Sequence, residues 1–270
     1  MKMLACPVKE FAMENNLRIA QPEKVKEIKE KIANLEPDMI VVVSYGKFLP
    51  ASILKIPKYG AINVHPSLLP KYRGSAPIQW AILKGDEVTG TTIMKMNEKM
   101  DAGDIILQKQ VPINENETTG ELWNRLSTIS SKLLSEAVEK IEKGQATYTK
   151  QGETYTLAPM LTKEMAKIDW NKLTSRELKN LVRGLNPILG AYCNLGQKKI
   201  KLWKVEIVPE KIDLGEAPGT IIVADCKKGL QIKTKDGAIA VLEIQGENAR
   251  KMSIQEFLRG NRLEVGEKLT

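Results

Sequence analysis

The first half of the chain alternates short apolar runs with longer segments in which apolar residues recur every three or four positions. Residues 38–44 form the clearest apolar run. The run is rich in β-branched side chains, which is typical of a parallel strand covered on both faces. Before it, residues 23–35 carry apolar side chains at helical spacing, and this predicts an amphipathic helix. Residues 45–50 are then expected to turn from the strand into a further helix.

Further elements follow the same alternation up to residue 143. In order, we predict a helix over residues 7–15, a short strand over 17–20, strands ending near His65 and spanning 91–96 and 105–111, a helix beginning near Ser75, and a long helix over 118–143. The long helix opens with Thr118 and Glu121, which have the spacing of a capping box. Strands and helices in alternation indicate a doubly wound α/β domain.

The pattern changes after residue 146. Residues 147–165 are polar and weakly periodic, so we predict a linker that separates a domain of residues 1–146 from a domain of residues 166–270. The second domain combines short alternating runs with turns that contain Gly or Pro, which is typical of a small β-barrel. These runs lie at 199–208, 219–223, 229–234 and 238–244, with helices near 176–185 and 253–258.

Composition narrows the class of protein. Of the 270 residues 42% are apolar, which is ordinary for a soluble globular chain. No run reaches the roughly 20 apolar residues of a membrane helix, and no signal peptide is evident, so we expect a cytoplasmic protein. Cys6, Cys193 and Cys226 lack disulfide or metal spacing, and the chain has one histidine. We therefore expect reduced cysteines and no metal.

The formal net charge is +8, and it is unevenly distributed. From Asn171 onward there are 18 Lys and Arg against 12 Asp and Glu, whereas residues 1–170 carry 23 against 21. Such an excess usually serves solubility, but it also suits a polyanionic partner such as RNA. The charge pattern leaves both readings open.

Candidate chemistry lies at the end of the strand that contains Asn63 and His65. The two residues are two positions apart, so on an extended backbone both side chains leave the same face. The carboxyl end of a buried strand is where α/β sheets place ligands. Asp101 follows another predicted strand, 36 positions after His65. Alone, a single His beside an apolar strand is more often structural than catalytic, and Asp101 alone is more often a turn cap.

The two motifs together resemble the folate-dependent formyltransferases. The residues concerned are N-x-H-x-S-L-L-P-x-x-R-G from Asn63 and M-D-A-G-D around Asp101. The resemblance extends from about Lys2 to Phe257. It implies a Rossmann-like catalytic domain followed by an OB-like barrel, and 10-formyltetrahydrofolate as co-substrate. A formyl group would pass to an amine, with no metal.

The resemblance assigns roles to the three candidate catalytic residues. Asn63 would donate its amide N–H to the developing oxyanion, a contribution of roughly 3–4 kcal/mol for a well-placed donor. His65, if protonated, would stabilise the same oxygen and pass a proton to the leaving nitrogen. Asp101 would hold the tautomer of His65 and favour its imidazolium form, directly or through a water.

The loop after His65 is the expected folate contact. The resemblance implies that Ser67, Leu68, Leu69 and Pro70 line the tetrahydrofolate site with an apolar wall and backbone amides. Arg73 lies just beyond, and two interpretations stay open. Its guanidinium could contact phosphate or ribose at the acceptor end of a tRNA, or it could make local hydrogen bonds.

The formyl acceptor is not decided by the catalytic motif. The basic second domain favours methionyl-tRNA, which would make formylmethionyl-tRNA for translation initiation, because a small acceptor gives no reason for a positively charged domain. An amino sugar or another small amine is the alternative. We expect a monomer when the chain is complete.

One departure from the family concerns the beginning of the chain. Members of the family begin with a strand, a helix and a strand, followed by a basic loop, and this sequence starts inside that loop at Met1. The first of those strands would pair beside residues 39–43. We therefore expect residues 39–43 to lie at an open sheet edge, which favours aggregation and low activity. An inactive tRNA-binding remnant is a further alternative.

Overall fold

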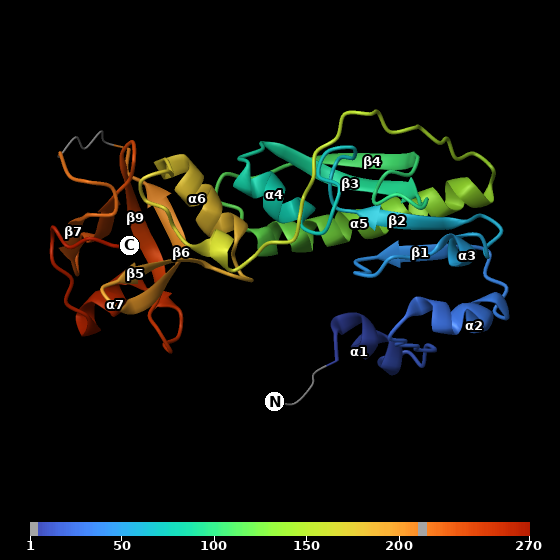
Figure 1. Cartoon of the computed structure of the whole chain (residues 1–270), viewed down its shortest axis with the longest axis horizontal. Coiled ribbons are helices and arrows are strands. Elements are labelled where there is room, and N and C mark those ends of the chain that lie inside the picture. The colour runs from blue at the N-terminus through green and yellow to red at the C-terminus, as the bar shows by residue number, and fades with distance from the viewer. Residues whose placement is uncertain (1–4, 210–214) are drawn as a thin grey trace.

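The computed structural model describes residues 5–209 and 215–270. It contains two sheets that follow one another along the long axis of the molecule, with helix α6 (Ser175–Gly184) between them (Figure 1). The first four residues of the expected entry loop lie outside the described residues. In the part of the chain that is described, no helix combines the length and apolar character needed to cross a membrane.

The first sheet has four strands in the order β1-β2-β3-β4. Its strands are β1 (Ile40–Val43), β2 (Ala61–His65), β3 (Val88–Lys95) and β4 (Ile105–Pro112). β1 and β2 are parallel, whereas β2–β3 and β3–β4 are antiparallel. The sheet is therefore mixed, and the predicted strands at residues 91–96 and 105–111 are confirmed.

The helices of this half lie on both faces of the sheet, because Ile62 and Val64 pack on the long helix whereas Val42 and Ala61 pack on the short helices that come before β2 in the chain. They are α1 (Pro7–Glu14), the short 3₁₀ helix η1 (Val25–Ile28), α2 (Lys29–Ala33), α3 (Ala51–Leu54), α4 (Pro77–Leu83) and α5 (Thr119–Glu142). α5 runs behind the strands (Figure 1) and buries Leu133 and Ala137 against Val64 and Ile93. The capping box predicted at Thr118 is present. Since Val64 points to α5, its neighbours on β2 point to the opposite face.

Three predictions near the N-terminus are corrected. Residues 17–20 form no strand, and Leu17 is 55% exposed. Residues 23–35 contain the short helices η1 and α2 rather than one continuous amphipathic helix. β1 is parallel but is not covered on both faces, because Val43 is 56% exposed. Its pairing does match the expectation of an open edge: among the described residues β1 has β2 as its only neighbour.

The second sheet is antiparallel throughout. Its strands are β5 (Ala191–Leu195), β6 (Lys198–Ile207), β7 (Ile221–Asp225), β8 (Gly229–Lys233), β9 (Ala238–Gln245) and β10 (Met252–Ser253), in the order β5-β6-β9-β8-β7 with β10 beside β9. Helices α6 and α7 (Ile254–Gly260) pack on its single apolar core. The predicted β domain after an α/β domain is confirmed, although the sequence analysis missed β5 and β10.

The last residues of the chain join the two edges of this second sheet. Leu269 pairs with Leu195 at the end of β5, and Lys268 pairs with Thr220 just before β7. The amide of Thr270 also donates to the carbonyl of Asn194 at 2.9 Å. Both edge strands therefore have a further backbone partner, which brings the sheet toward a closed barrel.

The predicted linker lies along the first sheet instead of spanning open solvent. The amide of Thr149 donates to the carbonyl of Ile105 at 2.9 Å, and Arg73 and Ala158 are joined by the amide of Ala158 at 2.7 Å. In Figure 1 this yellow-green segment passes across β3 and β4 before it reaches α6. The boundaries at residues 146 and 166 stay a prediction.

Candidate active site

β2 carries Asn63 and His65 to the face of the sheet that α5 does not cover. Asn63 is paired with Met94 of β3, and His65 with Thr92. Directly opposed residues of antiparallel strands share a face, so these four side chains lie on one surface. His65 is 4% exposed, whereas Asn63 is partly exposed. The predicted common face of the two residues is confirmed by this pairing.

The imidazole of His65 is fixed by a backbone carbonyl. Its Nε2 lies 2.8 Å from the carbonyl oxygen of Tyr72, and because a carbonyl can only accept, Nε2 carries the proton and donates it. The other ring nitrogen, Nδ1, is therefore the one that can take up a proton. Asp101 was expected to hold the tautomer of His65, but in the structure the carbonyl of Tyr72 does so.

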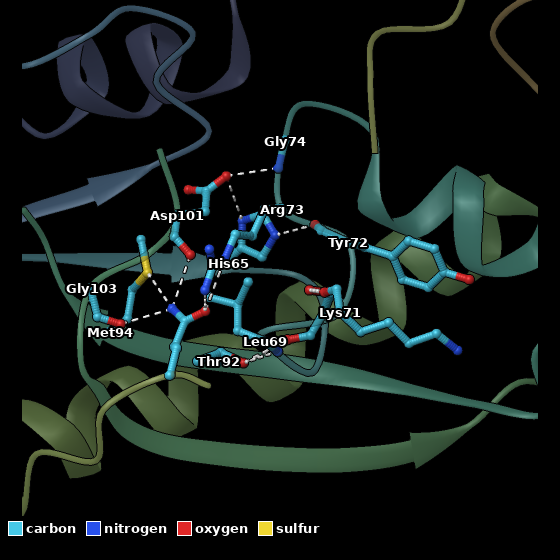
Figure 2. Close-up of polar contacts among 12 residues, drawn as sticks. His65, Leu69, Lys71, Tyr72, Arg73, Gly74, Thr92, Met94, Asp101 and Gly103 are labelled. Carbon is cyan, nitrogen blue, oxygen red and sulfur yellow. Dashed lines mark hydrogen bonds and ion pairs between the residues drawn. The ribbon is translucent and has the colours of Figure 1, made fainter. Parts of the chain in front are cut away.

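Asp101 lies beside Nδ1 on the loop between β3 and β4. Its Oδ2 is 3.7 Å from Nδ1 of His65 and accepts a hydrogen bond from the amide of Gly74 at 2.9 Å (Figure 2). Asp101 has a φ of 47°, an uncommon value for a residue with a side chain. The same loop requires Gly103, since a Cβ there would lie 1.7 Å from the carbonyl of Lys95.

Burial and charge act in opposite directions on His65. Burial lowers its pKa below the ordinary value of 6.5, and the carboxylate of Asp101 and the hydrogen bond to Tyr72 offset part of that effect. Desolvation disfavours the charged ring, so the resting imidazole is neutral at pH 7. A proton taken up by the ring would therefore lie on Nδ1, 3.7 Å from Oδ2 of Asp101.

The expected folate loop is held by a hydrogen bond within the loop and by another to strand β3. The hydroxyl of Ser67 donates to the carbonyl of Lys71 at 2.6 Å, and the amide of Leu69 donates to Oγ1 of Thr92 at 3.1 Å. The peptide bond between Leu69 and Pro70 is cis. Leu68 and Pro70 stay partly exposed, so they are the members of the loop that can present apolar surface to a ligand.

Arg73 makes local contacts and is 9% exposed. Its Nε and Nη2 both donate to Oε1 of Gln151, at 3.0 and 2.7 Å, and its guanidinium stacks on the ring of Tyr155. Of the two interpretations left open above, the structure supports local hydrogen bonding. A buried guanidinium that bonds to Gln151 and stacks on Tyr155 is not presented to a tRNA phosphate.

Three contributors to the site were not found from the sequence. The carbonyl of Tyr72 and the amide of Gly74 act through the backbone, so their side chains carry no signal. Gln151 lies in the segment taken as a linker, and it bonds to the Asp101 loop. Long-range backbone pairing brings it there, through Thr149 with Ile105 on one side and Leu157 with Arg73 on the other.

This fold and this arrangement of amide, imidazole and carboxylate define a group-transfer enzyme. The chain belongs to the formyl transferase family: residues 2–138 match the family model Formyl transferase, and residues 160–262 match Formyl transferase, C-terminal domain. Both halves of the molecule are therefore accounted for by one family.

Close relatives cover nearly the whole chain. A protein named methionyl-tRNA formyltransferase from Clostridioides difficile (strain 630) is 44% identical over 268 residues, which is 98% of this chain and 85% of that relative. A protein of the same name from Fusobacterium nucleatum subsp. nucleatum is 43% identical over 266 residues, covering 97% of this chain and 85% of the relative. The alignments include both sheets and the segment between them.

Solved structures share the fold at lower identity. HypX from Aquifex aeolicus, in complex with tetrahydrofolic acid, aligns with a TM-score of 0.65 and 21% identity over 91% of this chain and 43% of that one. WlaRD, a sugar 3N-formyl transferase with dTDP and 5-N-formyl-THF, aligns with a TM-score of 0.63 and 20% identity over 87% of this chain and 80% of that one.

Proposed function

We propose that the chain transfers a formyl group from 10-formyltetrahydrofolate to the amino group of methionyl-tRNA, giving formylmethionyl-tRNA for translation initiation. The observation that carries the proposal is the placement of Asp101 3.7 Å from Nδ1 of His65, on the face that also bears Asn63. Relatives that carry this activity in their name align over both domains. The catalytic domain is residues 1–146 and the tRNA-binding domain residues 166–270.

His65 moves the proton in the proposed reaction. The amine attacks the formyl carbon, a new C–N bond forms, and the proton of the amine passes to Nδ1 of His65. The bond from the formyl carbon to the folate nitrogen then breaks, and the same proton passes to that nitrogen. Asp101 stabilises the intervening imidazolium, since an opposite charge within a few ångströms favours the charged ring.

Asn63 and the loop after His65 serve the two other demands of the reaction. The amide of Asn63 donates to the oxygen that becomes negatively charged, as proposed from its type and position. Leu68 and Pro70 offer partly exposed apolar surface to the folate, and Ser67 and Leu69 hold the loop through their hydrogen bonds. These residues fit a folate co-substrate, because the faces of its ring system can pack on apolar side chains while its polar ring edge bonds to backbone groups.

Methionyl-tRNA is favoured as acceptor over an amino sugar by two observations. The sugar N-formyltransferase WlaRD is 20% identical to this chain, against more than 40% for the relatives named for methionyl-tRNA. The excess positive charge from Asn171 onward also suits phosphates. The cytoplasm is the compartment that matches this acceptor. We propose a monomeric enzyme without a metal.

A formyl-transfer assay with two acceptors tests the proposal. The chain is incubated with 10-formyltetrahydrofolate and either methionyl-tRNA or dTDP-3-amino-3-deoxy sugar, with His65→Ala as the blank. Formylmethionyl-tRNA is expected, with a KM that rises steeply with salt because phosphates are bound. If the sugar alone is formylated, the acceptor is an amino sugar and not methionyl-tRNA. If His65→Ala transfers the formyl group at the same rate as the wild type, His65 has no part in the mechanism.

A further inference from the structure

We infer that Gln151, in the segment between the two domains, is a positioning residue that holds Asp101 against His65, and that Arg73 positions Gln151. The assignment rests on the proposed role of Asp101 in formyl transfer. It gives the segment a part in catalysis beyond joining two domains.

Gln151 holds the backbone of the Asp101 loop at two points. Its Nε2 donates to the carbonyl of Asp101 at 2.9 Å and to the carbonyl of Gly103 at 2.8 Å (Figure 2). An amide nitrogen has two N–H bonds to give, so both are used on this loop. The two carbonyls lie on either side of one turn, and the single side chain fixes their separation.

The turn needs such support because its backbone is unusual. Asp101 has a left-handed φ of 47°, an unfavourable conformation for a residue with a side chain that persists when the surrounding contacts hold it in place. Without Gln151, the carboxylate of Asp101 would keep the hydrogen bond from the amide of Gly74, and the loop would keep the bond between Lys95 and Asp104 and the bond from Asn97 to the carbonyl of Ala102. None of these holds the carbonyls of Asp101 and Gly103. The backbone that carries the carboxylate would then shift relative to Nδ1 of His65, with Gly74 as its remaining anchor.

Arg73 binds the oxygen end of the Gln151 side-chain amide. Both of its donors meet Oε1 of Gln151, so the orientation of the Gln151 amide is fixed with Nε2 toward the Asp101 loop. In the backbone, Arg73 lies between Tyr72, whose carbonyl holds His65, and Gly74, whose amide holds Asp101. One short segment therefore sets the positions of the imidazole, the carboxylate and Gln151.

The segment that carries Gln151 is itself attached at both ends. Thr149 pairs with Ile105 at the start of β4, through amides at 2.9 and 2.8 Å. On the other side, the carbonyl of Thr156 accepts from the amide of Arg73 at 2.9 Å. Gln151 is thus placed by backbone pairing on either side of it, and its side chain reaches the loop from a fixed base.

Nuclear magnetic resonance of His65 provides a test that does not depend on turnover. The chain has one histidine, so ¹⁵N labelling of histidine gives the signals of a single imidazole. In Gln151→Leu the carboxylate of Asp101 should move away from His65. Its charge would then raise the pKa of His65 less, and burial would lower it as before. The pKa of His65 should therefore fall below that of the wild type. Asp101 is the charged group that raises this pKa. Asp101→Asn therefore shows how far the pKa of His65 falls when the effect of this charge is lost completely.

Kinetics and a matched variant complete the design. Gln151→Leu should lower kcat about 10- to 100-fold with KM for both substrates changed less than about 3-fold, because misplacement of a catalytic group acts mainly on the chemical step. Gln145→Leu makes the same substitution at an exposed position just before this segment and should change neither quantity. Gln151→Glu keeps the contact with Arg73 but points an acceptor at two carbonyls, so it should behave like Gln151→Leu.

The outcomes separate this inference from the proposed function. An unchanged pKa of His65 in folded Gln151→Leu overturns the positioning role, whether or not the wild type formylates methionyl-tRNA. Gln151→Glu is judged by kcat alone, because its added negative charge itself raises the pKa of a nearby imidazole. Global unfolding of both variants also overturns it, since Gln151 would then be a structural residue. A lowered pKa with a wild type that is inactive on methionyl-tRNA keeps the positioning role and discards the proposed acceptor.

Discussion

The two sheets of the molecule differ in how their edges end. In the second sheet, residues next to β5 and β7 both pair with the last residues of the chain, through Leu269 and Lys268. In the first sheet, β1 pairs with β2 alone among the described residues, and Val41 and Val43 are 43% and 56% exposed. The proposed catalytic residues Asn63 and His65 lie on the less protected sheet, on the strand next to that open edge.

This difference separates the sources of stability and of activity. The second sheet has one continuous apolar core, whereas the buried residues of the first half fall into three smaller clusters. Regions with fewer buried apolar contacts open at lower free energy. We therefore expect substitutions in the second sheet to act mainly on stability and those around His65 to act mainly on rate.

The largest effects should follow from removing catalytic side chains of the first sheet. Asn63→Ala and His65→Ala should each lower kcat by about 10²- to 10⁴-fold, with smaller changes in KM, because both act on charge that develops in the transition state. Steady-state kinetics with each substrate varied in turn measure this. A rise in KM with kcat intact would reassign the residue to substrate binding.

The second prediction concerns the core of the second sheet. Leu202 is 0% exposed, so Leu202→Ala should lower the free energy of unfolding by about 2–5 kcal/mol through lost burial and a cavity. Val43→Ala in the exposed part of β1 should cost less than about 1 kcal/mol. Urea unfolding followed by circular dichroism compares the two. Equal losses would show that β1 is as well packed as the second sheet.

Local sequence patterns predicted most of the helices and strands, and they predicted that Asn63 and His65 share one face of a strand. The spacing of Asn63 and His65 places both on one face whatever the tertiary structure, because strand geometry alone decides it. β5 escaped notice because its partly polar residues 191–195 form a strand only beside β6. Residues 17–20 have strand-like composition but no neighbouring strand, and composition alone forms no hydrogen bonds.

Long-range contacts are what the sequence could not supply. Nothing in the local sequence distinguishes Gln151 from other polar residues of the predicted linker. Its proposed role depends on contacts with residues about 50 and 80 positions away in the chain. Likewise the tautomer of His65 depends on the backbone of Tyr72, and backbone carbonyls are the same in every residue. A site that is fixed by backbone groups leaves few marks in the side-chain pattern.

The third prediction tests the open edge directly. Val43→Lys should reduce concentration-dependent self-association, because a charged side chain at an exposed strand edge disfavours pairing with another chain. Light scattering over a concentration series measures the effect. Val8→Lys on α1 is the control, since Val8 is 79% exposed but lies on a helix. Equal improvement by both variants would make general apolar exposure, not the strand edge, the cause.

The smallest effect expected is a pH dependence of stability confined to the first half of the chain. Burial lowers the pKa of His65 below 6.5, whereas the unfolded chain has the ordinary value. As pH falls below about 6.5 the unfolded state binds a proton that the folded state does not. The free energy of unfolding should therefore decrease from pH 6.5 down to the lowered pKa, and His65→Gln should lack this component.

The second sheet supplies the internal control for this last measurement, because the chain has no histidine after His65. Trp170 and Trp203 lie in the second half, and Trp80 and Trp123 in the first, so single-tryptophan variants report on each half separately. Unfolding of the first half between pH 7.5 and 5.5 should carry the slope that His65→Gln removes. Unfolding of the second half should show no change on that substitution. If His65→Gln removes the pH-dependent part of the unfolding free energy from both halves, the two halves unfold as one unit. The contact between α6 and α4 would then be strong enough to make the two sheets a single cooperative structure.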